Sequence, residues 1–169
     1  MNPADPTAYA LTVNGARHPV VTEPRKLLLD VLREDLGLTG PHAGCEHGVC
    51  GACTILMNGR SIRSCLMLGI QAAGSELLTI EGLAQGGTLH PLQDEFSTHH
   101  ALQCGYCTPG MILAALELLG EHPDPTEADV REALSGNLCR CTGYDSIVDA
   151  VLAASRRMRR APSTPRSGT

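Results

Sequence analysis

At 169 residues, 43% of them apolar, the chain is long enough for one domain or two small ones, each with a hydrophobic core. Three tyrosines, one phenylalanine and no tryptophan leave few rings for base stacking, and a net charge of −5 opposes phosphate binding. Nucleic-acid binding is therefore not expected. No apolar run approaches the length of a membrane-spanning helix, so we expect no transmembrane segment.

The first half alternates between strand and turn signals. Tyr9, Leu11 and Val13 follow the two-residue period of a strand, Asn14-Gly15 is a hairpin turn, and the apolar pattern resumes at Val20. Thr22 is predicted to cap a helix that ends at Gly37 and carries one apolar face, formed by Leu27, Leu28, Val31, Leu32 and Leu36.

A second hairpin is predicted around Asn58-Gly59, entered by the apolar run 54–57. A last short strand follows at 77–80. Strands with one helix packed against them indicate a small α+β domain, and we place it over residues 8–84.

The second half has helical periodicity. Helices are expected to open at Pro91, at Thr108-Pro109 and at Thr126, where Asp129 completes a capping box. Gly120 and Gly136 are expected to end the second and third, and a fourth helix covers 146–159. Four helices predict a four-helix bundle domain over residues 88–160. Glycines near residues 81–90 mark the boundary, and the polar segment 161–169 is expected to be disordered.

Eight cysteines fall into two sets of four, and their spacing carries most of the chemical information. The first quartet is Cys45, Cys50, Cys53 and Cys65; its C-x4-C-x2-C run is the plant-type [2Fe–2S] spacing. The second quartet is Cys104, Cys107, Cys139 and Cys141. We expect Cys53 and Cys65 at opposite ends of one hairpin, and the second quartet in two loops between helices.

Disulfides and zinc are the alternatives. The polar start, Met1 to Tyr9, lacks the features of a secretion signal, so a reducing cytoplasm is expected, where clustered cysteines usually bind metal. Zinc sites usually pair two short knuckles, which the first quartet does not resemble. For the second quartet, spacing alone leaves iron–sulfur and zinc both open. Because both quartets are complete, none of the seven histidines is expected to be a ligand.

Three strings resemble the iron–sulfur module of the molybdenum hydroxylases, the family of xanthine dehydrogenase and the aldehyde oxidoreductases. They are G-C-E-H-G-V-C-G-A-C-T (44–54), Q-C-G-Y-C-T-P-G (103–110) and N-L-C-R-C-T-G-Y (137–144). The resemblance covers roughly residues 8–158 and includes all eight cysteines. It implies a ferredoxin-like (β-grasp) first domain and a [2Fe–2S] cluster in each domain, so iron rather than zinc in the second.

The resemblance also implies roles and partners. The second quartet would lie next to a molybdopterin, expected as the cytosine dinucleotide, with Gln103 hydrogen-bonding the pterin and Cys139 beside it. The first quartet would lie on the flavin side. A chain of this size resembles the small subunit of an (αβγ)2 enzyme, whose large subunit binds molybdopterin and whose medium subunit binds FAD. Such a subunit relays electrons and carries no catalytic residue of its own.

Two rival functions remain at this point. A diffusible ferredoxin-type carrier would have no need of the helical half or Gln103, and a structural zinc adaptor would hold no labile sulfide. The sequence does not select a substrate for the whole enzyme. Purines, N-heteroaromatic compounds, aldehydes and carbon monoxide all stay open, with the E-H-G string after Cys45 leaning toward organic substrates.

Overall fold

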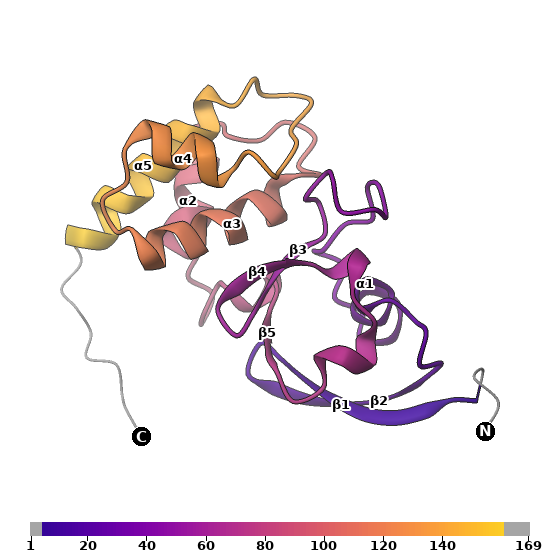
Figure 1. Cartoon of the computed structure of the whole chain (residues 1–169). Helices are drawn as coiled ribbons and strands as arrows, with labels where there is room; N and C mark the ends of the chain where they lie inside the picture. The colour runs from indigo at the N-terminus through magenta and orange to yellow at the C-terminus, as the bar shows by residue number, and fades with distance from the viewer. Residues whose placement is uncertain (1–4, 161–169) are drawn as a thin grey trace.

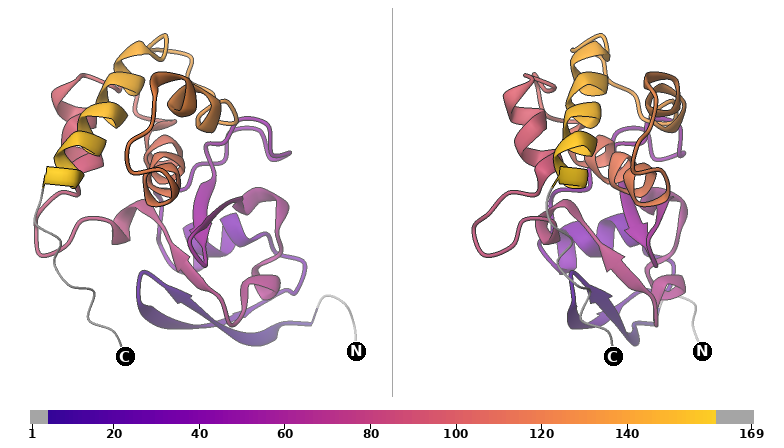
Figure 2. Two further views of the ribbon diagram at one scale, coloured as in Figure 1. Left: turned by 60° about the vertical axis from the view of Figure 1, so that its left-hand side comes forward. Right: turned by 90° about the vertical axis from the view of Figure 1, so that its left-hand side faces the viewer.

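The computed structural model describes residues 5–160, so the expectation for the tail 161–169 lies outside the described residues. It shows a mixed five-stranded sheet on one side of the molecule and four helices, α2–α5, gathered on the other (Figures 1 and 2). Within residues 5–160, no helix is both long and apolar enough to span a bilayer.

The sheet has the order β2-β1-β5-β3-β4. Its strands are β1 (Thr7–Val13), β2 (Ala16–Thr22), β3 (Thr54–Met57), β4 (Arg60–Arg63) and β5 (Glu76–Leu78). β1–β2 and β3–β4 are antiparallel hairpins, while β5 lies parallel to β1 and antiparallel to β3. β5 thus joins the two hairpins into one sheet.

Both predicted hairpin turns are confirmed. Asn14 and Gly15 have φ of 53° and 77°, and Asn58 and Gly59 have φ of 51° and 82°. A two-residue hairpin turn with both φ values positive matches the twist of its strands, and asparagine followed by glycine tolerates this conformation best.

The helix of the first half begins later than predicted. Its α-helical part, α1, is Leu28–Asp30 and continues as a π-helical turn, η1 (Val31–Asp35). The N-cap is Leu27 and its side chain makes no capping hydrogen bond, so the prediction that Thr22 caps this helix was wrong. Leu27 instead forms a β-bridge with Leu68, which keeps the chain extended up to the helix.

Leu28, Val31 and Leu32 of the predicted apolar face are buried in the core of this half, and Leu36 packs against it, whereas Leu27 lies before the helix and outside this core. Gly37, with φ of 69°, follows the helical segment as expected. Short 3-10 turns η2 (Ser64–Leu66) and η3 (Gly69–Ala72) complete this half. The buried core of the first half consists of Leu11, Val13, Val20, Leu28, Val31, Leu32, Ile55, Ala72 and Leu77.

The second half is helical, with its own core. After the 3-10 turn η4 (Ile80–Gly82) come α2 (Pro91–Thr98), α3 (Thr108–Glu121), α4 (Glu127–Ala133) and α5 (Asp145–Arg160). The predicted capping box at Thr126 is present: the Thr126 hydroxyl accepts from the Asp129 amide at 3.2 Å, and the Asp129 carboxylate accepts from the Thr126 amide at 2.8 Å. Gly120 lies inside α3, and α4 ends before Gly136, so neither glycine ends its helix as predicted.

Helix α3 connects the two halves. It contacts β3 and β4 on one side and α2 and α4 on the other. The Ser61 amide in β4 donates to the Glu117 carboxylate in α3 at 3.1 Å. The largest fully buried residues of the helical core are Phe96, Leu92, Met111 and Ile147. The division into domains 8–84 and 88–160 remains a prediction, although each half has a separate buried core.

Candidate metal centres

The first quartet is held by a long loop and a hairpin. Cys45 and Cys50 lie in the segment without regular structure that precedes β3, and Figure 1 shows this purple segment reaching toward the helices. Cys53 and Cys65 are buried at the two ends of the β3–β4 hairpin, as predicted. The Ser64 hydroxyl donates to the Cys53 carbonyl at 2.8 Å, which fixes one end of the hairpin against the other.

Backbone amides in this loop point at the Cys45 sulfur. The Cys50 amide nitrogen lies 3.4 Å from Cys45 Sγ, and N–H groups of His47 and Cys50 lower the pKa of Cys45 to about 6. Left-handed backbone at Glu46 and Gly48, with φ of 58° and 82°, gives the loop its tight curvature. Amides directed at a sulfur stabilise thiolate, the form that binds metal.

Burial has the opposite effect on the inner cysteines of this quartet. It raises the pKa of Cys65 to about 11 and also raises the pKa of Cys50. A buried thiolate is unfavourable without a nearby positive charge, and an iron ion bound there would supply it.

The second quartet occupies two loops of the helical half. Cys104 and Cys107 immediately precede α3, and Cys139 and Cys141 lie in the loop between α4 and α5, as predicted. The Sγ atoms of Cys104 and Cys141 are 3.4 Å apart. Burial raises the pKa of Cys107 to about 12, whereas the Tyr106 amide lowers that of Cys104.

The eight sulfurs meet as four pairs. Cys45 contacts Cys50, Cys53 contacts Cys65, Cys104 contacts Cys141 and Cys107 contacts Cys139. Within residues 5–160, no three histidine, cysteine, aspartate or glutamate side chains converge on a single-ion site. A [2Fe–2S] centre needs only two protein thiolates on each iron, so four sulfur pairs fit two such centres.

A cavity of about 240 Å³ opens beside the second quartet. All four of its cysteines line the cavity together with Cys50 of the first quartet. Beside Cys107, the Thr108 hydroxyl is the one buried side-chain polar atom of the described residues that has no hydrogen-bond partner. A cavity walled by four thiols fits a bound group that thiolates would hold.

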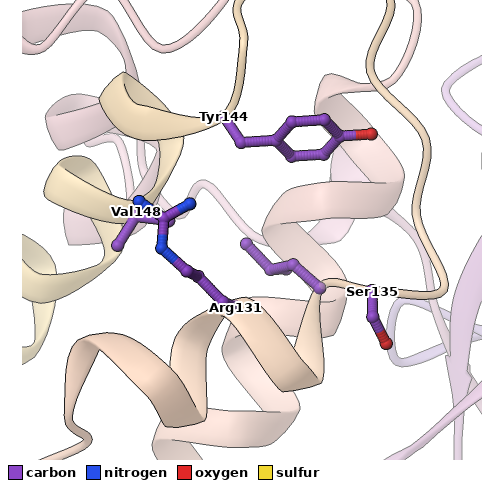
Figure 3. A pocket seen from close by; sticks show the side chains of 5 residues that line it. Arg131, Ser135, Tyr144 and Val148 are labelled. Carbon is purple, nitrogen blue, oxygen red and sulfur yellow. The ribbon is translucent and has the colours of Figure 1, made fainter.

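Tyr144 holds the second cysteine loop in a way that the sequence did not indicate. Its hydroxyl accepts from the Cys139 amide at 2.9 Å, and its own backbone has a φ of 75°. Figure 3 shows its ring lining a small cavity of about 140 Å³ between α4 and α5, together with Arg131 and Val148. Thr142 Oγ1 lies 3.2 Å from Cys139 Sγ on the other side of the loop.

Tyr106 makes a different contact. Its ring stacks on His42 with centroids 4.4 Å apart, and its hydroxyl donates to the Ala43 carbonyl at 2.7 Å. These contacts join the loop of the second quartet to the loop of the first. Gln103 is exposed beside the exposed Cys104, and its role in binding a pterin remains a prediction.

Comparison with known protein families identifies the class of protein to which the chain belongs. Residues 11–86 match the 2Fe-2S iron-sulfur cluster binding domain, and residues 79–152 match the [2Fe-2S] binding domain. Together with the two thiol quartets, these matches define an iron–sulfur protein with two [2Fe–2S] domains.

Individual relatives show to which family of iron–sulfur proteins the chain belongs. The chain is 55% identical over 153 residues to the nicotine 6-hydroxylase small subunit of Paenarthrobacter nicotinovorans, covering 90% of this chain and 92% of the relative. It is 52% identical to the nicotinate dehydrogenase small FeS subunit of Eubacterium barkeri, covering 87% and 94%. A chain of quinoline 2-oxidoreductase from Pseudomonas putida 86 superposes with a TM-score of 0.90 at 50% identity, covering 94% and 99%. The chain belongs to the iron–sulfur small subunits of the molybdenum hydroxylase family, and its role is electron transfer.

Proposed function

We propose that this chain relays electrons from a molybdopterin on a large subunit to FAD on a medium subunit. In this proposal Cys104, Cys107, Cys139 and Cys141 ligate the [2Fe–2S] cluster next to the molybdopterin, and Cys45, Cys50, Cys53 and Cys65 ligate the cluster on the flavin side. The pterin is the cytosine dinucleotide form, Gln103 hydrogen-bonds it, and Cys139 lies beside it. The ferredoxin-like (β-grasp) domain and four-helix bundle, an (αβγ)2 assembly and a cytoplasmic location complete the proposal.

One observation carries the relay: a backbone hydrogen bond joins the loops that hold the two quartets. The Leu138 amide donates to the Cys50 carbonyl at 2.8 Å, which places the residue before Cys139 directly against a cysteine of the first quartet. Cys50 also lines the cavity of the second quartet. Electron transfer by tunnelling falls steeply with distance, so a two-centre relay needs this proximity. A diffusible one-centre carrier does not.

The surface around each quartet supports two different partners. Beside the second quartet, Leu102, Tyr106 and Leu138 are exposed, and beside the first quartet, Val49 and Leu66 are exposed. Large apolar side chains grouped around a functional site are typical of protein interfaces. We assign the first group to the molybdopterin subunit and the second group to the flavin subunit.

The chain's own residues supply thiolates, amide donors and a dry setting. Bound iron supplies the reversible one-electron change that the relay requires. The buried Cys53, Cys65 and Cys107 exclude water from one side of each site. The amides around Cys45 donate toward sulfur, and such hydrogen bonds tune the reduction potential.

A nitrogen heterocycle is the substrate class we propose for the whole enzyme. Nicotine, nicotinate, caffeine and quinoline, named in relatives that are 50–55% identical, are all nitrogen heterocycles. This chain has no role in substrate recognition, so the proposal concerns its large-subunit partner.

Affinity purification of the tagged chain from its own host tests the assembly. The expected eluate contains two larger chains, molybdenum and FAD, and a nitrogen heterocycle reduces its iron–sulfur centres without added reductant. Recovery of the chain alone, with full iron and sulfide, would instead indicate a free carrier. Stoichiometric zinc without sulfide would indicate the structural adaptor.

A further inference from the structure

A buried polar network joins the two halves of the molecule between the quartets. Asn137, in the loop after α4, is only 2% exposed. Its side-chain amide donates to the Gly51 carbonyl at 3.1 Å and to the Thr54 hydroxyl at 3.2 Å. Gly51 lies between Cys50 and Cys53, while Asn137 lies two residues before Cys139. One amide therefore links the chain segments that carry both quartets.

Arg63 closes this network from the sheet side. Its guanidinium donates to the Thr54 hydroxyl and the Gly136 carbonyl, both at 2.7 Å, and to Asn137 Oδ1 at 3.3 Å. The fully buried Thr54 hydroxyl in turn donates to the Gly51 carbonyl at 2.6 Å. Each buried polar group of the network thus has a partner, which is the condition under which such a network fixes one geometry. We call Arg63, Thr54 and Asn137 the interloop latch.

The backbones at the latch approach too closely for any side chain between them. A Cβ atom on Gly51, whose φ is 74°, would lie 2.6 Å from the Gly136 carbonyl oxygen. A Cβ on Gly110 would lie 2.4 Å from the Gly51 carbonyl oxygen. The backbones are therefore in direct contact at Gly51 and Gly136, so a change in the hydrogen bonds of Asn137 shifts one cysteine loop relative to the other.

We propose that Asn137 is a positioning residue that fixes the separation of the two quartets and so sets the rate of electron exchange between them. The inference rests on the proposed function, because it concerns exchange between two iron–sulfur centres. Asn137 contributes no sulfur ligand. It acts through the Gly51 carbonyl on one side and through the chain that leads to Cys139 on the other. The Leu138–Cys50 hydrogen bond adjoins the latch and depends on the same loop position.

The test compares Asn137→Ala with a matched control, Asn14→Ala, in the purified complex. The Asn14 side chain also bridges two segments: its amide donates to the Thr79 hydroxyl at 3.0 Å, and its Oδ1 accepts from the Thr79 amide at 2.9 Å. That bridge lies within the first half and involves no residue of the latch. Both variants are expected to lower the melting temperature, since each leaves buried partners unsatisfied.

The deciding readouts are magnetic and kinetic. With both centres reduced, low-temperature EPR measures their spin–spin interaction, and pulse radiolysis followed by optical detection measures exchange between them. Asn137→Ala should change the spin–spin splitting and slow the exchange several-fold while iron and sulfide stay at wild-type content. Asn14→Ala should leave both quantities as in the wild type.

Wild-type splitting and exchange in a fully loaded Asn137→Ala variant would overturn the inference while leaving the relay intact. Absence of iron–sulfur centres in the wild type would instead overturn the proposed function. Where Asn137→Ala does not retain both centres, Asn137→Asp is measured instead. This substitution keeps the size of the side chain but removes the amide that donates to the Gly51 carbonyl and the Thr54 hydroxyl, and unchanged splitting in that variant would equally overturn the inference.

Discussion

The backbone amide of Leu138 and the carbonyl of Cys50 form a 2.8 Å hydrogen bond between the two cysteine loops. The two residues are far apart in the sequence and belong to different halves of the molecule. Cys50 is a member of the first quartet, and Leu138 directly precedes Cys139 of the second. In the proposed relay, this contact holds the two cysteine loops side by side.

Replacing Gln103 with alanine should slow reduction of the iron–sulfur centres by substrate while both centres still assemble. Gln103 is exposed beside Cys104 in the free chain, where a pterin on the large subunit would meet it. Loss of a hydrogen-bonding side chain at that junction costs about 1–3 kcal/mol in local cofactor binding. Stopped-flow absorbance of the complex measures the reduction rate. Gln85→Ala, an exposed glutamine remote from both quartets, is the control. A wild-type rate in Gln103→Ala, with cofactor retained, would show that Gln103 is only a loop residue.

Tyr144→Phe should raise the reduction potential of the second-quartet centre. The substitution removes the oxygen that accepts the Cys139 amide, so this N–H becomes available to a sulfur. Hydrogen bonds to sulfur favour the more negative, reduced state. Loss of the bond should also lower the free energy of unfolding by about 1 kcal/mol.

Tyr106→Phe is the control for that measurement. It also deletes a tyrosine hydroxyl next to the second quartet, but that hydroxyl donates to the Ala43 carbonyl and contacts no cysteine amide. Potentiometric titration monitored by EPR should show a shift in Tyr144→Phe alone. If the reduction potential of the second-quartet centre were the same in the two variants, Tyr144 would have only a packing role.

His90 should make the folded state less stable in acid. Burial lowers the pKa of His90 below its usual value of 6.5, and its Nδ1 accepts from the Leu92 amide at the start of α2. The unfolded chain therefore takes up a proton more readily than the folded one. The contribution to stability is complete above the unfolded pKa and is lost as pH falls through the lowered pKa of the folded state.

His90→Asn provides the comparison, because asparagine caps a helix without titrating in this range. Urea unfolding of both proteins at about pH 7.5 and about pH 5.5 measures the effect. The free energy of unfolding should fall more for the wild type than for His90→Asn. If the free energy of unfolding fell equally in the two proteins, His90 would not be the cause of the acid sensitivity.

Local signals predicted local structure well. Asn14-Gly15 predicted its hairpin because two positive φ values are needed there, and Thr126 with Asp129 predicted its helix start because both side chains bond within one turn. The start of α1 was mispredicted because Leu27 pairs with Leu68, a contact that no local pattern reveals.

At the candidate site, too, local sequence patterns did not reveal contacts between distant residues. Cysteine spacing predicted both quartets, since ligands close in sequence constrain each other directly, although their ligand roles remain predictions. Asn137 and Tyr144 are the first and last residues of the string N-L-C-R-C-T-G-Y, but the string did not indicate what their side chains contact. Asn137 acts through Gly51, on the other half of the molecule, and the hydroxyl of Tyr144 reaches the Cys139 amide only once the loop has folded.

Reductive titration of the complex with low-temperature EPR tests the central claim most directly. About four irons and four acid-labile sulfides per chain should give two distinct signals, one from each thiol quartet. Cys50→Ser should remove one signal and Cys107→Ser the other, with the remaining signal intact in each. Loss of both signals from either replacement, in a chain that still folds, would contradict two separate centres joined by a short relay.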